Sequence, residues 1–433
     1  MLSPCRFRFF VSRLRERLWV RPLALCVLSV GAIFVARLAD NLSFSSLAPE
    51  INLDSVESLL TVMASSMLVI ATFAVGSMVA AYASASAGAT PRSIPLVIAD
   101  DVTQNALSAF IGAFIFSNVA LVAVKSDLFQ FAGLFSIFAL TLLVFAIVVI
   151  TFVRWVDRIA RLGRVVNIIE KAEKAAGDSL DRRRHSPTLG ALESPLNQEH
   201  YRDTGISVYS STVGYVQHID LENLQSSAEA LDCRLVVAAL PGAFVGTRRP
   251  LLYVMGWSDQ QEASAITELS RAFTISSNRT FEDDPRFGLL ALSEIAGKAL
   301  SPGINDPGTA INVIGTHVRL FTLWQSPLEQ DRLKPVSYDR VSVPRLVTED
   351  LFDDAFTAIA RDGAGMVEVA IRLQKAFSAL AETDDAAIVA AARKHSRMAL
   401  ARAEKALSLQ DDIDAVSIAA GFCPMDLSLD KIR

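Results

Sequence analysis

Residues 128–153 read LFQFAGLFSIFALTLLVFAIVVITFV and contain no charged side chain. A helix needs about 20 apolar residues to cross the hydrocarbon layer of a membrane, so this run predicts a transmembrane helix. Two earlier stretches, 59–83 and 106–124, meet the same requirement. The sequence therefore predicts an integral membrane α-helical region in the first part of the chain.

A shorter apolar run, PLALCVLSVGAIFVA at 22–36, is framed by Arg21 and Arg37. Their long side chains can reach the membrane interfaces, so we expect a fourth span here. A cleaved signal peptide is the alternative, although Arg37 interrupts the place where a cleavage site would follow. Basic residues precede this run and follow residue 153, and positive charges stay on the cytoplasmic side. We therefore expect a multi-pass protein of the bacterial inner membrane with both termini in the cytoplasm.

Small residues recur at every fourth position of the second span, which places one ridge along a helix. The ridge consists of Thr72, Gly76, Ala80, Ser84 and Gly88. Small residues let helices approach closely, so the ridge predicts packing inside the four-helix bundle or, alternatively, a polar pathway at the centre of an oligomer. No Asp, Glu, Lys or Arg lies deep in a predicted span, which argues against a proton relay or a coupling-ion site.

The overall composition excludes several classes of protein. The 433 residues are 52% hydrophobic and carry a formal net charge of -5, which argues against a nucleic-acid binder. The four cysteines are far apart in the sequence and no histidine clusters beside them, so neither a disulfide framework nor a zinc site is indicated. We expect no metal and no cofactor.

The region after the spans is expected to be cytoplasmic and α+β. ISVYSSTVGYVQHI and CRLVVAAL are rich in β-branched residues and predict strands, and the spacing of Gly214 and Gly242 resembles that of barrel-sandwich hybrids, which indicates a small β-barrel-like module. RRRHSP at 182–187 reads as a flexible linker. The expected divisions are a basic cytoplasmic arm at 1–21, a four-span transmembrane domain at 22–153, a membrane-exit helix and linker at 154–200, a small β module at 201–257, a helical cytoplasmic module at 258–410 and a mobile tail at 411–433.

The stretch SPGINDPGTA at 301–310 follows a pattern that also occurs at 284–285, where an Asp-Pro pair precedes an apolar helical run. Asp is a strong N-cap and Pro is preorganised for the first helical position, so two helices are predicted to begin at these pairs. A tight turn then joins them, with a positive φ at Gly303 if the turn is of type II. Capping does not explain Asn305, and polar groups at a helix N-terminus can also bind an anion. Two interpretations remain, a structural turn or a ligand or gating turn formed by Ser301, Gly303, Asn305 and Asp306.

The sequence RTFEDDPRFGLLALSEIAGKALSPGINDPGTA at 279–310, together with GYVQHID at 214–220 and the N-terminal spans, closely resembles a bacterial family of predicted membrane proteins. This family of unknown function is known as domain of unknown function twenty-two fifty-four. The resemblance extends from the first span to about residue 410. It implies an integral membrane protein with a cytoplasmic C-terminal region and no established activity.

Motifs of common enzymes are missing from the sequence. It contains no G-x-S-x-G, H-E-x-x-H, Walker or G-x-G-x-x-G pattern, and its five histidines are scattered, so we expect no enzyme. Our first hypothesis is an oligomeric channel or transport-related protein regulated by its cytoplasmic region. The alternative is a membrane-anchored sensor or scaffold that binds a protein or a small anion. The expected partners are the lipid bilayer and further copies of the chain, and not nucleic acid.

Overall fold

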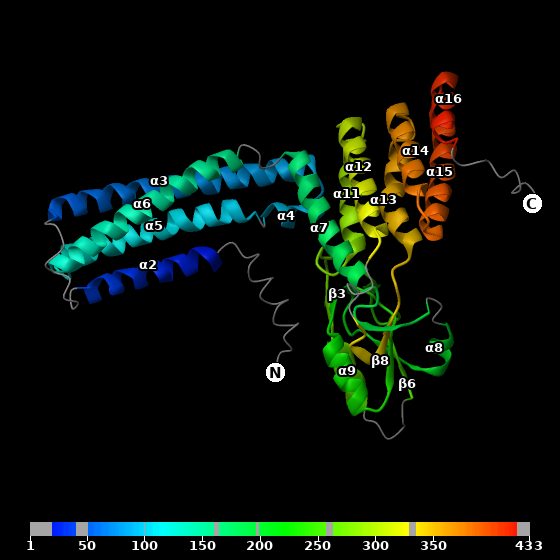
Figure 1. Ribbon diagram of the computed structural model, residues 1–433, viewed down its shortest axis with the longest axis horizontal. Coiled ribbons are helices and arrows are strands. Elements are labelled where there is room, and N and C mark those ends of the chain that lie inside the picture. Colours follow the sequence, from blue (N-terminus) through cyan, green and yellow to red (C-terminus); the bar gives the residue numbers. More distant parts are fainter. Residues whose placement is uncertain are drawn as a thin grey trace, which may run out of the picture. The chain divides into compact units, whose positions relative to one another are not determined.

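The computed structural model describes residues 20–39, 51–98, 100–159, 164–195, 199–256, 263–328 and 335–421. The chain forms two compact units (Figure 1). Unit 1 contains Gly88–Arg92 and Ile169–Arg433, and unit 2 contains Phe7–Ala87 and Ser93–Ile168. Residues 1–19 of the expected basic arm and 422–433 of the expected tail lie outside the described residues.

Unit 2 is built from α-helices. The elements in this part of the chain are α2 (Val20–Ala39), α3 (Leu53–Gly88), η2 (Pro91–Ser93), α4 (Ile94–Ile98), α5 (Asp101–Lys125) and α6 (Phe131–Ile159). Among the described residues, three segments are long and apolar enough to cross a membrane, namely Leu53–Ser86, Val102–Lys125 and Ala132–Ile159. These coincide with three of the four predicted spans.

The fourth predicted span, at 22–36, is not confirmed. A helix does form there, α2, in which the apolar stretch among the described side chains is Pro22–Gly31. α2 lies against α5, where Ser29 Oγ donates to the carbonyl oxygen of Gly112 at 3.3 Å.

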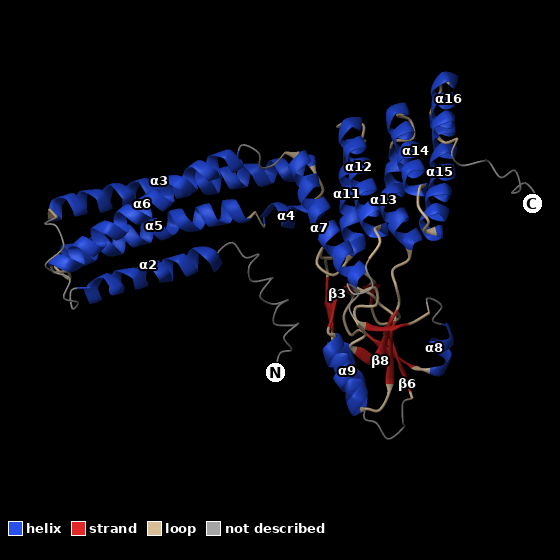
Figure 2. Cartoon of the chain, viewed as in Figure 1, coloured by secondary structure: helices blue, strands red, loops and turns tan. Residues whose placement is uncertain are grey.

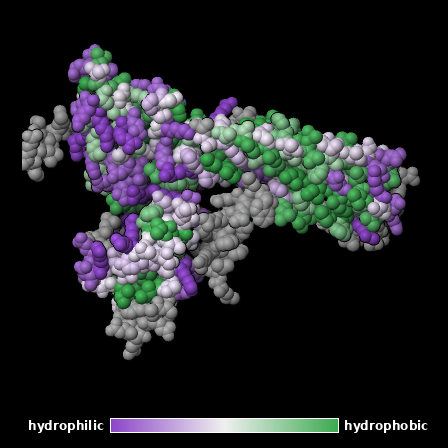
Figure 3. Space-filling model, turned by 180° about the vertical axis from the view of Figure 1, so that it is seen from behind, coloured by the Kyte–Doolittle hydropathy of each residue, from purple (hydrophilic) through white to green (hydrophobic). Residues whose placement is uncertain are grey.

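The outward surface of unit 2 is apolar, as Figure 3 shows for one face. Val69 and Phe73 of α3 are 68% and 65% exposed, while Met67 and Ala74 of the same helix are 4% and 0% exposed. Apolar side chains on both sides of a long helix are typical of a helix surrounded by lipid on one side and protein on the other.

The described residues of unit 1 form two open β-sheets. The strands are β1 (Ala191–Glu193), β2 (Ile206–Tyr209), β3 (Gly214–Ile219), β4 (Arg234–Val237), β5 (Phe244–Val245), β6 (Pro250–Met255), β7 (Phe273–Ser276) and β8 (Tyr338–Val343). One sheet has the order β1-β8-β4-β6-β2 and the other β5-β3-β7. Neither sheet closes, so the expected β-barrel-like module is not confirmed. The reason is non-local pairing: β1, β7 and β8 come from outside 201–257, and β8 pairs in parallel with β4.

Helices make up the rest of unit 1 (Figure 2). They are α7 (Val165–His185), α8 (Glu199–Thr204), α9 (Leu221–Ala230), α10 (Ala263–Arg271), α11 (Pro285–Ala299), α12 (Pro307–Gln325), α13 (Thr348–Asp362), α14 (Val367–Ala381), α15 (Ala386–Ala406) and α16 (Gln410–Ala419). Two predictions differ from this result. Residues 182–185 of the expected linker form the last turn of α7, and the expected tail begins with α16.

Close packing explains why α7 continues through residue 185. A Cβ at Gly288 of α11 would lie 2.4 Å from Cβ of Ala176 of α7, so the two helices approach as closely as a glycine permits. At its C-terminal end, Arg184 donates to the carbonyl oxygens of Leu323 and Ser326. The end of α7 is therefore held by tertiary contacts that local sequence does not reveal.

An aromatic cluster forms the core between α12, α13 and α14. The rings of Phe321, Phe352, Phe356 and Phe377 contact one another at centroid distances of 4.4–5.7 Å. His317 of α12 packs edge-on against Phe356, and neither of its ring nitrogens has a hydrogen-bond partner among the described residues. Burial lowers the pKa of His317 from 6.5 to about 3.

This shift predicts acid sensitivity. The unfolded chain binds a proton on His317 below pH 6.5, whereas the folded protein does not until about pH 3, so stability is unaffected above pH 6.5 and falls as the pH decreases below it. Between pH 6.5 and 4.5 the loss should be about 2–3 kcal/mol. His317→Leu should remove that loss, as measured by amide hydrogen exchange of α12 in the full chain. The exposed His200→Gln serves as control, and an unchanged pH dependence in His317→Leu would contradict the assignment.

Candidate functional site

The loop between β4 and β5 forms one wall of a cavity in unit 1. Gly242 in this loop has a φ of +91°, a conformation that favours glycine. Its amide donates to the carbonyl oxygen of Val216 at 2.8 Å, which ties the loop to β3. A Cβ at position 242 would lie 2.3 Å from Oδ2 of Asp284. The loop therefore approaches the Asp284 carboxylate at a distance that only glycine allows.

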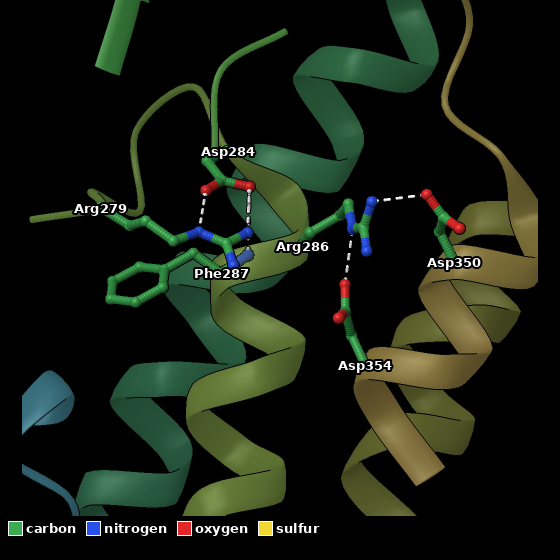
Figure 4. A network of polar contacts seen from close by, with 6 residues as sticks. All are labelled: Arg279, Asp284, Arg286, Phe287, Asp350 and Asp354. Atoms are coloured by element: carbon green, nitrogen blue, oxygen red, sulfur yellow. Dashed lines mark hydrogen bonds and ion pairs between the residues drawn. The ribbon is translucent and has the colours of Figure 1, made fainter. Parts of the chain in front are cut away.

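Asp284 begins α11 and is 1% exposed. Its Oδ1 accepts a hydrogen bond from the amide of Phe287 at 3.2 Å, so it is the N-cap that the sequence predicts. Arg279 donates Nε to Oδ2 at 2.6 Å and Nη2 to Oδ1 at 3.0 Å, and its guanidinium carbon lies 5.4 Å from the Phe287 ring centroid (Figure 4). Burial raises the pKa of Asp284, and the bonds from Arg279 act in the opposite direction.

Arg286, in the first turn of α11, links this helix to α13 (Figure 4). Its Nη1 donates to Oδ2 of Asp350 at 2.5 Å, and its Nε donates to Oδ2 of Asp354 at 2.6 Å. Two carboxylates on successive turns of α13 therefore fix the direction of one guanidinium group.

A further positive charge, the guanidinium of Arg183, lies near Asp284. Arg183 of α7 is 3% exposed, and none of its guanidinium nitrogens has a hydrogen-bond partner in the part of the chain that is described. Burial lowers the pKa of Arg183 to about 10, and the negative charges of Asp283 and Asp284 act against this effect. The side chain is thus a cation at neutral pH. Asp283 also contacts Nδ1 of His218 at 2.6 Å.

Gly242, Arg279, Arg286 and Asp350 line a cavity of about 370 Å³. Its lining residues include four arginines and one acid, namely Arg249, Arg279, Arg286, Arg345 and Asp350. The remaining lining residues are apolar or glycine, namely Ala238, Leu240, Pro241, Gly242, Ala243, Phe244, Pro344, Leu346 and Val347. Guanidinium groups suit carboxylate and phosphate groups, so the cavity has the chemistry of an anion site.

Not all of the hydrogen-bonding capacity of these arginines is used. Within the described ranges, no hydrogen bond involves Nη1 of Arg279 or Nη2 of Arg286. Arg249 donates to the carbonyl oxygen of Phe244 at 3.1 Å and has no carboxylate partner in the same ranges. Arg345 pairs with Glu193 at 2.9 Å, but both side chains are more than half exposed. Donors therefore remain available to a bound anion.

A metal site has no support in this region. Across the described segments, no group of three or more His, Cys, Asp or Glu side chains is placed to hold a metal ion. The acidic run at 282–284 is used otherwise, because Asp283 pairs with His218 and Asp284 pairs with Arg279.

The turn at 301–306 lies elsewhere on unit 1. Asp306 accepts hydrogen bonds from the amide and hydroxyl of Thr309 at 3.0 and 2.6 Å, so it caps α12 as predicted. The expected positive φ is not at Gly303 but at Asn305, whose φ is 51°. Asn tolerates this conformation, which gives Asn305 a backbone role. Ser301 donates to the carbonyl oxygen of Lys298, and none of the four residues lines the cavity. Their role as a ligand or gating turn stays a prediction.

The small-residue ridge of α3 lies on the exposed side of that helix. Thr72, Gly76, Ala80 and Ser84 are all exposed, and a Cβ on Gly76 would have no neighbour within 4 Å. The ridge therefore does not pack against the other described helices of unit 2, contrary to the first interpretation. Its role in a pathway stays a prediction. Gly88, the last member, ends α3 and belongs to unit 1.

The segment Gly88–Arg92 contacts the C-terminal half of α11 within unit 1. Thr90 Oγ1 donates to Oε2 of Glu294 at 2.8 Å, and Arg92 forms an ion pair with the same carboxylate. Lys298 Nζ donates to the carbonyl oxygen of Ala89 at 2.7 Å. One helix thus carries Asp284 and Arg286 at its start and the partners of this segment about 15 Å further along.

Sequence reasoning missed the arginine cavity. Arg279 and Arg286 flank the Asp-Pro pair in RTFEDDPRF, and Arg249 ends the TRR turn, but such residues usually read as solvated charges. The one local signal was Gly242 after a proline, which indicates a turn. Only the fold brings that turn to Asp284 and places Arg345 on the same cavity.

Gly242→Ala tests the close approach of the loop to Asp284. Strain at a positive φ should destabilise unit 1 by about 1–3 kcal/mol, and displacement of Asp284 from Arg279 should add to this. Gly303→Ala is the matched control, because a Cβ there meets nothing within 4 Å. Hydrogen exchange of the α11 amides in the full chain would measure the stability of α11 in both variants. Equal destabilisation by the two substitutions would contradict the close contact of Gly242 with Asp284.

Comparison with known proteins agrees with the membrane character of the chain. Uncharacterized proteins of Mycobacterium bovis (Mb1321c) and Mycobacterium tuberculosis (Rv1290c) are each 33% identical to it over 108 residues. The aligned part is 23% of this chain and 20% of each relative, so the match spans only a fifth of their length. No solved structure matches. The profile of one family matches residues 15–379, and the chain belongs to that family, Predicted membrane protein (DUF2254).

Proposed function

We propose that the protein is a membrane-anchored sensor that binds a small anion in the arginine-lined cavity of unit 1. The observation that carries this proposal is the set of four arginines on one 370 Å³ cavity with a single acid among the lining residues. Volumes of about 300–1,000 Å³ are usual for sites that bind small molecules.

Preorganisation supports binding over a purely structural role. Asp284 holds Arg279 in a bidentate pair, and Asp350 with Asp354 holds Arg286, so the two guanidinium groups lose little freedom when a ligand arrives. The guanidinium donors that these pairs leave unused face the cavity lining and can bind a ligand.

We propose binding without catalysis. None of the residues that line this cavity is a Ser, Thr, Cys, Lys or His, so it lacks a hydroxyl, thiol or amine nucleophile. The distribution of basic residues in the sequence favours a bacterial inner-membrane location with unit 1 and both termini in the cytoplasm. Such a protein would report on a cytoplasmic anion from the membrane surface.

Inorganic phosphate titrated into the full chain in nanodiscs provides the test. Wild type should bind it by calorimetry, and Arg249→Gln should weaken binding about 10-fold to 100-fold, since a hydrogen bond to a charged group contributes about 1.5–3 kcal/mol. Arg234→Gln is the control, because this exposed arginine of β4 does not line the cavity. Absence of binding by wild type, or equal binding by both variants, would reject the anion sensor.

A second candidate is the oligomeric channel or transport-related protein regulated by its cytoplasmic part. The exposed ridge of α3 favours it, because small residues on an outward face suit close contact with another copy of the chain. The contacts of Gly88–Arg92 with α11 favour regulation, since this segment directly follows α3 in the chain.

Gly76→Leu tests this second candidate. A larger side chain on the ridge should separate the copies of the chain and reduce ion flux in liposomes to background. Ile150→Leu, on the exposed surface of α6, is the control and should change neither the oligomeric state nor the flux. Analytical ultracentrifugation in detergent would report the mass of the assembly. Where the wild type conducts ions, Glu294→Gln should alter the flux, because it removes the partner of Thr90 and Arg92. A wild-type monomer without ion flux would exclude the channel.

A further inference from the structure

The cavity combines charged and apolar surfaces, and this combination narrows the class of ligand. Its apolar lining includes Leu240, Pro241, Phe244 and Pro344. An inorganic anion would contact the arginines and leave this surface exposed to water. A ligand with both an anionic group and an apolar part would cover both surfaces.

Phe244 is the aromatic residue of the cavity lining. It is 52% exposed although it belongs to β5, where it pairs with Tyr215 of β3. The two rings meet edge to face, with centroids 5.1 Å apart and an interplanar angle of 65°. Arg249 donates to its carbonyl oxygen at 3.1 Å. Its backbone is held in place while half of its surface remains open, which suits the stacking of a planar group.

The arginines favour a phosphate over a carboxylate. Nη1 of Arg279 and Nη2 of Arg286 make no hydrogen bond in the described part of the chain, and Arg249 lacks a carboxylate partner there. A phosphate monoester offers three terminal oxygens to donors that come from different directions, whereas a carboxylate offers two in one plane.

Asp350 adds a requirement for donors on the ligand. Its Oδ2 accepts from Arg286, its side chain is 45% exposed, and its Oδ1 accepts no hydrogen bond from the described residues. A free acceptor beside an anion site repels a bare anion but can accept from a hydroxyl or an amino group on the same ligand.

We propose that the cavity binds a nucleoside monophosphate, with the phosphate on the arginines, a hydroxyl or amino group on Asp350 and the base against Phe244. This inference rests on the proposed anion-binding function and specifies its ligand class. A sugar phosphate would satisfy the arginines and Asp350 but would not use Phe244, and a free nucleoside would lack the phosphate.

Four probes separate these contributions in the full chain in nanodiscs: adenosine 5′-monophosphate, ribose 5-phosphate, inorganic phosphate and adenosine. The monophosphate should bind at least tenfold more tightly than ribose 5-phosphate, and adenosine should bind more weakly than either. Phe244→Ala should abolish the tenfold difference without changing the affinity for inorganic phosphate. Tyr209→Ala is the matched control, because Tyr209 is 44% exposed and does not line the cavity.

The outcomes distinguish this inference from the proposed function. Equal affinities for adenosine 5′-monophosphate and ribose 5-phosphate would overturn the nucleotide assignment and leave the anion sensor intact. The same conclusion would follow if Phe244→Ala kept the tenfold difference. Failure of inorganic phosphate to bind to the wild type would overturn both, because the nucleotide assignment rests on the anion site. The retained affinity of Phe244→Ala for inorganic phosphate shows that the variant is folded.

Discussion

The Asp284 carboxylate is the group on which the arrangement of unit 1 depends. It caps α11, forms a bidentate pair with Arg279 and lies against Gly242 of the loop after β4. Arg183 of α7 supplies further positive charge to the same region. Removal of one partner from a buried ion pair leaves an uncompensated charge and costs about 3–5 kcal/mol. A single carboxylate therefore holds the Gly242 loop and Arg279 at the start of α11, and both of these residues line the cavity.

α11 connects the cavity with the segment that follows α3. Its first turn carries Arg286, which binds α13, and its C-terminal half carries Glu294 and Lys298, which bind residues 89–92. Ten of its residues are buried, so it cannot bend or unwind without disturbing the core. The two ends of α11 are therefore held in fixed positions relative to each other within unit 1.

Local chemistry made parts of the fold predictable. The starts of α11 and α12 followed from their Asp-Pro pairs, because capping involves only neighbouring residues. The long spans followed from composition. Three features required information that is distant in sequence: the parallel pairing of β8 with β4, the helical end of α7 at 182–185, and the cavity itself. The turn before α12 shows the same limit, since its positive φ lies at Asn305 and not at Gly303 as predicted.

The balance of charges around the cavity explains how it can select a ligand. Arg279 and Arg286 are offset by Asp284, Asp350 and Asp354, so these two arginines attract distant anions only weakly. Binding energy must then come from short, directed hydrogen bonds to the unused guanidinium donors and from contact with the apolar lining. A small inorganic anion gains only the first contribution. A ligand that places a phosphate on the arginines and a planar group on Phe244 gains both, which is why the mixed surface favours it.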